Sequence, residues 1–350
     1  MKSRIRRSLY STGLALALLI IGSGLVWAYG TCAFESASAG KLYSCYFSRI
    51  NTIAEKRGVP AALEYVRFVV YPNNGYAMVH VLLHRVGDLA FYENANVAQM
   101  SSYLLPYQNL IQDRLLLGGF DGFIHGYVTE YMESQKDKIP ATMKYLCGGG
   151  LQIPTVTTDP GLCYHMLGHA LMHASGNELD TALGLCDTAS TTVTREGCYY
   201  GTFMEDSFLY NAQYHEESSR PDSIGPSMKG VCDRFTGERE TYCDMYVGES
   251  YLARHPDDTA GAFRECESLK QNQSNCVSRL GNILIASFAH NASDIKTMCD
   301  KYASPIYQRY CISSAQESLQ AGLGIQSRLS FATYMDNLLH AFGLSVLALK

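Results

Sequence analysis

Apolar residues recur along most of the chain at the spacing of amphipathic helices. Residues 77–91 show this clearly, and residues 60–70 and 123–132 contain similar helical patterns. In residues 77–91 the apolar face consists of Val79, Leu82, Leu83, Val86 and Leu89. The segment YPNNG at 71–75 predicts a turn between two helices. No convincing alternation of apolar and polar residues marks a strand, so the chain beyond its N-terminal segment is predicted to be all-α.

Residues 1–28 have the composition of a targeting segment. Four basic residues, Lys2, Arg4, Arg6 and Arg7, precede 17 residues without a charge, GLALALLIIGSGLVWAY. This order is typical of a signal peptide, with cleavage after Ala28. The alternative is an uncleaved membrane anchor, since 17 residues is at the short limit for a spanning helix. In both cases the basic residues place the rest of the chain outside the cytoplasm, in the periplasm or the extracellular space.

The twelve cysteines agree with export. None of them forms a C-x-x-C motif, which argues against a thioredoxin-type redox pair, and their spacings do not suit zinc knuckles. They form six pairs whose members lie ten to sixteen residues apart: Cys32/Cys45, Cys147/Cys163, Cys186/Cys198, Cys232/Cys243, Cys266/Cys276 and Cys299/Cys311. We predict that each pair forms a local disulfide, which requires an oxidising compartment.

The cysteine spacing also predicts a repeat of helix hairpins. From Cys147 onward, the first members of successive pairs recur every 33 to 46 residues, which is the range of helix–turn–helix repeats. In each unit the first cysteine ends one helical run and the second opens the next, so the disulfide closes the mouth of a hairpin. One hairpin cannot bury its apolar face alone, and neighbouring hairpins must therefore stack. The predicted fold is an α-solenoid-like stack of disulfide-stapled hairpins over 146–350, preceded by a helical region with histidine-rich helices over 29–145.

Glycines recur at one position of the predicted repeat. Gly168, Gly248 and Gly281 each lie five residues after the second cysteine of their pair. Glycine inside a helix costs about 1 kcal/mol relative to alanine. Its recurrence therefore predicts close approach between neighbouring helices.

Histidines gather in the predicted helices of the first half of the exported chain. His80 and His84 are four residues apart, as are His165 and His169, and residues at this spacing share one helix face. Two such helices facing one another, with His125 from a third, could form a site of three or four imidazoles. The predicted metal ligands are His80, His84, His125, His165 and His169. Imidazole suits zinc, copper and iron, so the expected cofactor is one of these transition-metal ions.

Two carboxylates fall in helical segments near the histidines. Glu130 and Glu205 could complete the metal site or act as a general base, and they are the predicted catalytic residues. His173 continues the spacing of His165 and His169, but the helical drift of about 40° per four residues predicts that it leans away from a shared ion. The competing interpretation treats these residues as hydrogen-bonded core or surface groups, since a single H-x-x-x-H pair is weak evidence for a metal.

Several function classes are disfavoured. The chain contains no H-E-x-x-H, G-x-S-x-G, Walker or G-x-G-x-x-G motif. Its net charge is -5 and it has no run of five basic residues, so nucleic acid is not an expected partner. With every cysteine paired, a cysteine nucleophile is also disfavoured.

Two functions remain open. The first is an exported metal-binding helical-repeat protein, with a His/Glu site in its N-terminal half that serves a metal-dependent enzyme of redox or hydrolytic type. The alternative is a non-catalytic helical scaffold that binds a peptide, glycan or protein partner outside the cytoplasm, and that contacts the membrane through its N-terminal segment if this is not cleaved. The histidine-rich first half favours the metal site, because a pure scaffold has no need of histidine in its first repeats alone.

Overall fold

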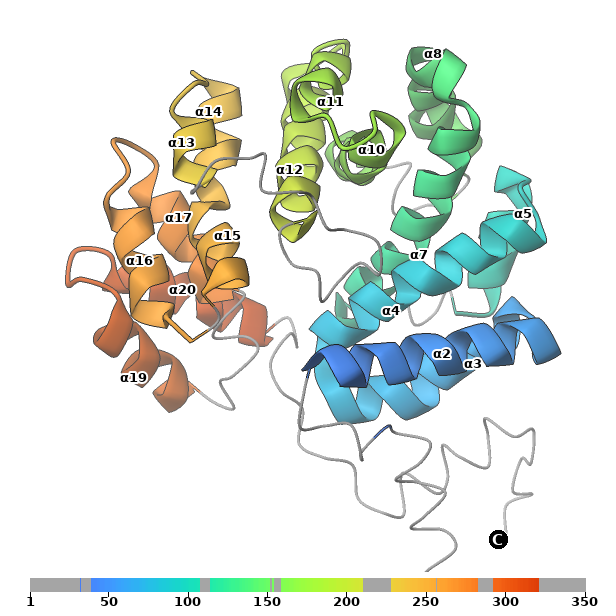
Figure 1. Ribbon diagram of the computed structural model, residues 1–350, viewed down its shortest axis with the longest axis horizontal. Coiled ribbons are helices and arrows are strands. Elements are labelled where there is room, and N and C mark those ends of the chain that lie inside the picture. Colours follow the sequence, from blue (N-terminus) through green and yellow to red (C-terminus); the bar gives the residue numbers. More distant parts are fainter. Residues whose placement is uncertain are drawn as a thin grey trace, which may run out of the picture. The chain divides into compact units, whose positions relative to one another are not determined.

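The computed structural model describes residues 32, 39–107, 114–151, 153, 159–209, 228–255, 257–282 and 292–320 (Figure 1). These residues form helices and connecting loops, and no strand occurs among them. The predicted all-α class is therefore confirmed. The predicted targeting segment at 1–28 lies outside the described residues. None of the helices in the described ranges is long and apolar enough to cross a membrane.

Two compact units divide the chain, Met1–Arg49 and Ile50–Lys350. The disulfide Cys32–Cys45 lies in the first unit and joins residue 32 to helix α2 (Ala39–Arg57). Residues 39–49 of α2 belong to the first unit and residues 50–57 to the second. The predicted domain boundary between residues 145 and 146 stays a prediction.

The second unit begins with α3 (Val59–Tyr65), the π-helical segment η2 (Val66–Val70), α4 (Tyr71–Glu93), α5 (Val97–Leu104) and the 3-10 turn η3 (Leu105–Tyr107). The turn predicted at 71–75 is wrong, because α4 begins at Tyr71. Val70 keeps right-handed helical backbone angles, with φ −78° and ψ −53°. Pro72 falls in the first turn of α4, the one part of a helix where its fixed φ and missing N–H are tolerated.

The next elements are α7 (Arg114–Ser134), η4 (Lys136–Lys138), α8 (Ile139–Tyr145), η5 (Leu146–Gly150), α10 (Pro160–Ala174), α11 (Leu179–Cys186) and α12 (Thr192–Leu209). Asp159 caps α10, because its Oδ1 accepts a hydrogen bond from Leu162 N at 3.1 Å. Every residue of α10 from His165 to Met172 is buried, so this helix lies in the core.

The last described elements are α13 (Met228–Cys232), α14 (Glu238–Met245), α15 (Val247–Arg254), α16 (Thr259–Glu267), α17 (Gln273–Leu280), α19 (Ala292–Tyr302) and α20 (Gln308–Gln320). Asp258 caps α16 by accepting a hydrogen bond from Gly261 N at 2.8 Å. This bond satisfies one of the backbone N–H groups that the first turn of a helix leaves without a helical partner.

All six predicted disulfides form, and each joins cysteines close along the chain. The pairs are Cys32–Cys45, Cys147–Cys163, Cys186–Cys198, Cys232–Cys243, Cys266–Cys276 and Cys299–Cys311. Cys186 and Cys232 are the last residues of α11 and α13, as predicted. Cys299 does not end its helix, because α19 continues for three more residues to Tyr302.

The second cysteine of each later pair does not open its helix, so this part of the prediction is wrong. All five lie inside helices that begin earlier: Cys163 in α10, Cys198 in α12, Cys243 in α14, Cys276 in α17 and Cys311 in α20. Their helices begin respectively at Pro160, Thr192, Glu238, Gln273 and Gln308. Each of these disulfides therefore attaches to the body of the second helix and not to its first residue.

Backbone hydrogen bonds explain why these helices begin before their cysteines. The N–H groups of Cys163, Cys276 and Cys311 donate to carbonyl oxygens four residues earlier, at 3.1, 3.1 and 3.2 Å. This is the bond that closes a turn of α-helix, so a full turn already precedes each cysteine. In α14 the corresponding first bond runs from Thr241 N to Gly237 O at 3.0 Å, ahead of Cys243. Polar residues that suggest a loop thus form the first turn of the helix.

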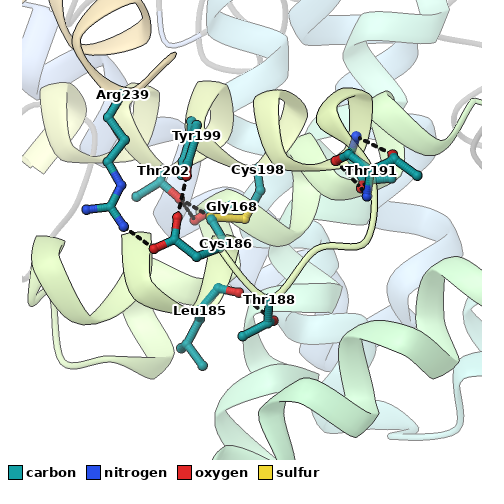
Figure 2. The surroundings of a disulfide bond; sticks show 11 residues. Gly168, Leu185, Cys186, Thr188, Thr191, Cys198, Tyr199, Thr202 and Arg239 are labelled. Atoms are coloured by element: carbon teal, nitrogen blue, oxygen red, sulfur yellow. Dashed lines mark hydrogen bonds and ion pairs between the residues drawn. A yellow bond between two sulfur atoms is a disulfide. The ribbon is translucent and has the colours of Figure 1, made fainter. Parts of the chain in front are cut away.

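Thr191 accounts for the early start of α12. Its Oγ1 accepts a hydrogen bond from Thr194 N at 3.2 Å and so caps the helix, seven residues before Cys198 (Figure 2). The disulfide Cys186–Cys198 thus joins the end of α11 to the middle of α12. The stacking of these hairpins as true repeats stays a prediction.

Glycines set the distance between neighbouring helices. α4 packs against α7, α7 contacts α10, and α10 packs against α12 (Figure 1). A Cβ added to Gly87 of α4 would lie 2.1 Å from the Phe123 carbonyl oxygen of α7. Added Cβ atoms on Gly168, Gly248 and Gly281 would meet their nearest neighbours at 2.3, 2.6 and 2.6 Å. The predicted close approach is confirmed at Gly168 and Gly281, whose added Cβ atoms would meet backbone oxygens, whereas the atoms nearest to Gly248 belong to the side chains of Cys266 and Leu280.

Candidate metal centre

Five histidines from three helices meet in the interior of the second unit. His80 and His84 come from α4, His125 from α7, and His165 and His169 from α10. The ring centroid of His125 lies 5.3, 5.1, 5.6 and 4.4 Å from those of the other four, in chain order. His125 is completely buried, and His169 is 1% exposed. The structure therefore gathers all five predicted ligands in one place, around His125.

Two glycines of α7 bring its backbone against the histidine-bearing turns of α4. A Cβ on Gly122 would lie 2.1 Å from the carbonyl oxygen of His80, and one on Gly126 would lie 2.0 Å from that of His84. The two glycines flank His125 along α7. Because no side chain separates the helices there, the imidazole of His125 reaches the two imidazoles of α4.

The imidazole nitrogens lie at separations that suit a bound metal ion. His80 Nε2 and His84 Nε2 are 3.2 Å apart, His84 Nε2 and His125 Nδ1 are 3.3 Å apart, and His165 Nε2 and His169 Nε2 are 3.4 Å apart. With metal–nitrogen bonds of about 2.0–2.1 Å, neighbouring ligands lie about 3.3–3.4 Å apart in a tetrahedral site and about 2.9–3.0 Å apart in an octahedral one. The observed separations fall within this span.

Two groups of three histidines each have ligand atoms within 4.8 Å of one another: His80, His84 and His125, and His125, His165 and His169. These buried clusters could hold a metal ion. Hydrogen bonds between imidazoles leave His125 Nε2 and His165 Nδ1 buried without a hydrogen-bond partner among the described residues. An unsatisfied buried polar atom costs about 1–3 kcal/mol, so the cluster is costly to bury as it stands.

Glu205 of α12 supports the α10 histidines from outside the cluster. It is 1% exposed, with Oε2 lying 2.8 Å from His169 Nδ1 and Oε1 lying 3.0 Å from His173 Nε2. An ionised carboxylate only accepts hydrogen bonds, so with Glu205 ionised His169 carries its proton on Nδ1 and turns the Nε2 lone pair toward His165. A carboxylate behind the outer nitrogen is the usual support of a metal-binding histidine.

Burial lowers the pKa of two imidazoles of the cluster, His125 and His165. The pKa of His125 is held well below its ordinary value by burial and then by the charge of the neighbouring histidines. Burial, the charge of His169 and the charge of Arg279 lower the pKa of His165 in the same way. Burial also raises the pKa of Asp121, whose partly exposed carboxyl has Oδ1 3.4 Å from His125 Nε2, to about 7. Neutral imidazole is the form that binds metals, so a lowered pKa keeps His125 and His165 in the metal-binding form at neutral pH.

His173 takes part in a contact that the sequence did not predict. As expected, it belongs to neither group of three histidines, but it reaches Glu205 on a different helix. Burial by itself lowers the pKa of His173, but the hydrogen bond and negative charge of Glu205 outweigh it and raise the pKa overall. Glu130 also belongs to neither group, and its Oε2 accepts a hydrogen bond from Tyr92 at 2.6 Å. The catalytic roles predicted for Glu130 and Glu205 stay predictions.

A guanidinium borders the cluster at its His165 end. The Tyr200 ring lies 4.6 Å from the His165 ring, and Arg279 Nη1 donates a hydrogen bond to the Tyr200 hydroxyl at 3.3 Å. Arg279 Nε also donates to Glu249 Oε2 at 3.0 Å, in an ion pair whose side chains are each 12% exposed. Sequence reasoning missed this group because Tyr200 and Arg279 are 79 residues apart and no motif connects them.

Comparisons of the chain with protein-family models, with curated proteins and with solved structures gave no match. Functional inference therefore rests on the geometry and chemistry of the residues described above.

Proposed function

We propose that the protein is an exported metal-binding protein whose histidine cluster holds a transition-metal ion for catalysis, of redox or hydrolytic type. One observation carries the proposal: five imidazoles, four of them buried, converge from three helices with nitrogen separations of 3.2 to 3.4 Å. Imidazoles crowded in the interior lose their hydration and oppose one another's protonation, which makes them poor core residues. The same properties make them good metal ligands.

The donor set favours zinc, copper or iron. The inner atoms of the cluster are imidazole nitrogens, and carboxylate oxygens lie behind them. All twelve cysteines are in disulfides, so thiolate ligands do not compete. Affinity for nitrogen donors is highest for copper(II) in the series of divalent ions. Copper is therefore expected to bind most tightly of the three.

The six disulfides support an oxidising compartment for this chemistry. Export through residues 1–28 is part of the proposal. A bound ion would polarise a coordinated water for hydrolysis or exchange electrons with a substrate. In this proposal Glu205 orients His169 and does not act as a base, because both of its oxygens already contact histidines.

Metal analysis of the protein as purified, with its disulfides intact, tests the proposal. We expect at least one zinc, copper or iron ion per chain. H125A removes the histidine shared by both groups and is expected to bind less metal than the wild-type chain. H255A is the matched control, since His255 is exposed and packs on Tyr251 with ring centroids 4.6 Å apart. This variant is expected to keep the metal.

Thermal unfolding of the wild-type protein tests the proposal without any variant, so the result does not depend on whether a substituted chain folds. A ligand present at about 1,000 times its Kd stabilises the folded state by about 4 kcal/mol. A chelator should therefore lower the Tm of the wild-type protein, and returning the ion should restore it. Metal-free wild-type protein, whose Tm responds neither to chelator nor to added zinc, copper or iron, would contradict the proposal.

A partner-binding scaffold is the second candidate, and a surface pocket favours it. The pocket has a volume of about 450 Å³. Its lining consists of Asp187, Tyr199, Arg234, Phe235, Thr236, Glu238 and Arg239. Charged groups of both signs around two aromatic rings suit a polar peptide or protein segment. This function would be supported in place of the first if metal-free protein captured one defined partner and the R234A/R239A variant did not.

A further inference from the structure

Ring orientation divides the five histidines into two sets. In the α4–α7 group, which is His80, His84 and His125, the ring planes are inclined to one another by 67°, 83° and 70°. An imidazole donates its lone pair within the ring plane, so rings that are steeply inclined at this distance can direct their nitrogens at one point. The α4–α7 group therefore has the arrangement of three ligands around one ion.

The second set is the α10 pair, His165 and His169. Their rings are inclined by 87°, and their Nε2 atoms are 3.4 Å apart. His125 does not join this pair well, because it lies face to face with His169 at an interplanar angle of 28° and a centroid distance of 4.4 Å. The lone pairs of stacked rings lie in nearly parallel planes and therefore do not meet at one ion between the rings. Moreover, His125 Nδ1 already faces His84.

Each set has a carboxylate of its own. Asp121 Oδ1 lies 3.4 Å from the outer nitrogen of His125 in the α4–α7 group, and Glu205 Oε2 lies 2.8 Å from Nδ1 of His169 in the α10 pair. Two cations in a protein interior need nearby negative charge to offset their loss of hydration. The two carboxylates lie on different helices, α7 and α12, and each backs a histidine of only one set.

We propose that the cluster binds two transition-metal ions, one in the α4–α7 group and one at the α10 pair. This inference rests on the proposed function. The first ion receives three protein ligands. The second receives two, so it binds more weakly and keeps open positions for water or for an oxygen donor of the substrate.

Zinc(II) titration of metal-depleted protein with intact disulfides measures the number of ions. The wild-type chain is expected to bind two equivalents, one tightly and one more weakly. H80Q/H84Q should lose the tight equivalent and keep the weak one, and H165Q/H169Q should do the reverse. H255Q is the control and should bind two. Near-ultraviolet circular dichroism checks the fold of each variant, and the single variants H84Q and H169Q replace any double variant that does not fold.

Copper(II) provides a second readout, through electron paramagnetic resonance. The first equivalent should give the signal of an isolated copper ion with nitrogen ligands. The second equivalent places another unpaired electron nearby, and the coupling between them should broaden or cancel the signal. In either double variant the single remaining copper ion should give an uncoupled signal.

The outcomes separate this inference from the function on which it rests. If the wild-type chain binds one ion and either double variant abolishes that binding, the site is mononuclear and the two-ion proposal is overturned, while the metal-binding function stands. If the folded wild-type chain binds none of zinc, copper and iron, both proposals fail.

Discussion

A single added methyl group at Gly201 should separate two helices and disturb the histidine cluster. Gly201 lies on α12, and a Cβ there would be 1.9 Å from the carbonyl oxygen of His165 on α10 and 3.2 Å from the Cα of Gly168. Backbone atoms inside a helix cannot turn aside as a flexible side chain can. Since nonbonded carbon contacts are most favourable at about 3.5–4.0 Å, α10 and α12 must move apart by more than about 1 Å in G201A.

Two opposing effects set the size of the change. Overpacking a close contact typically costs about 1–3 kcal/mol. The cost of G201A should lie at the upper end of this range, because the atoms that the added Cβ would meet, in His165 and Gly168, belong to the backbone. Replacing glycine by alanine inside a helix returns about 1 kcal/mol. The net loss in the free energy of unfolding is therefore about 2 kcal/mol for G201A. Gly184 of α11 provides the matched control, because nothing lies within 4 Å of its added Cβ and G184A should gain up to about 1 kcal/mol.

Urea unfolding with intact disulfides, followed by circular dichroism, measures both variants. The difference between G184A and G201A should be about 3 kcal/mol in favour of G184A. Metal affinity is the second measurement: Glu205 lies one turn beyond Gly201 on α12, so separating the helices should draw it away from His169 and weaken binding in G201A alone. Equal stability of the two variants, with unchanged metal affinity, would refute the close contact between α10 and α12.

Two further predictions concern buried charges outside the cluster. R279M leaves the carboxylate of Glu249 without its partner and should cost about 3 kcal/mol, most of which R279M/E249Q should restore; stability within error of wild type in R279M would contradict the pairing. Burial raises the pKa of Asp244 to about 6 in the folded protein. The folded state therefore holds this proton more tightly than the unfolded state, which stabilises the fold at a pH below about 4. This contribution is lost as the pH rises from about 4 to 6. D244N should therefore gain stability over wild type across this interval, by at most about 3 kcal/mol, and a pH-independent difference in urea midpoints would show that Asp244 does not titrate this way.

The disulfides could be predicted from the sequence because each joins cysteines close along the chain. The ends of the helices were less predictable. The segment before Cys198 has a polar composition that suggests a loop, yet Thr191 caps a helix there and α12 begins at Thr192. Likewise YPNNG has the composition of a turn, but α4 continues directly from η2. In both places a local hydrogen bond or the preceding helix outweighed the average preference of the residues.

The candidate site shows the same division. The spacing of four residues places His80 beside His84 and His165 beside His169, because helix geometry alone decides which residues share a face. Spacing could not show that these two faces meet around His125. That depends on glycines whose lack of a side chain lets one helix rest against the backbone of another, as Gly126 does against His84.

The sequence by itself determined the helical class, the six local disulfides and the histidines worth testing, since all three follow from residues near one another in the chain. Only the tertiary structure decided that Glu205 supports His169, that Arg279 borders the cluster through Tyr200, and that His173 turns to a carboxylate on another helix. These contacts join residues 32 to 79 positions apart. No local pattern encodes them, because they exist only once close-packed helices have fixed both partners in space.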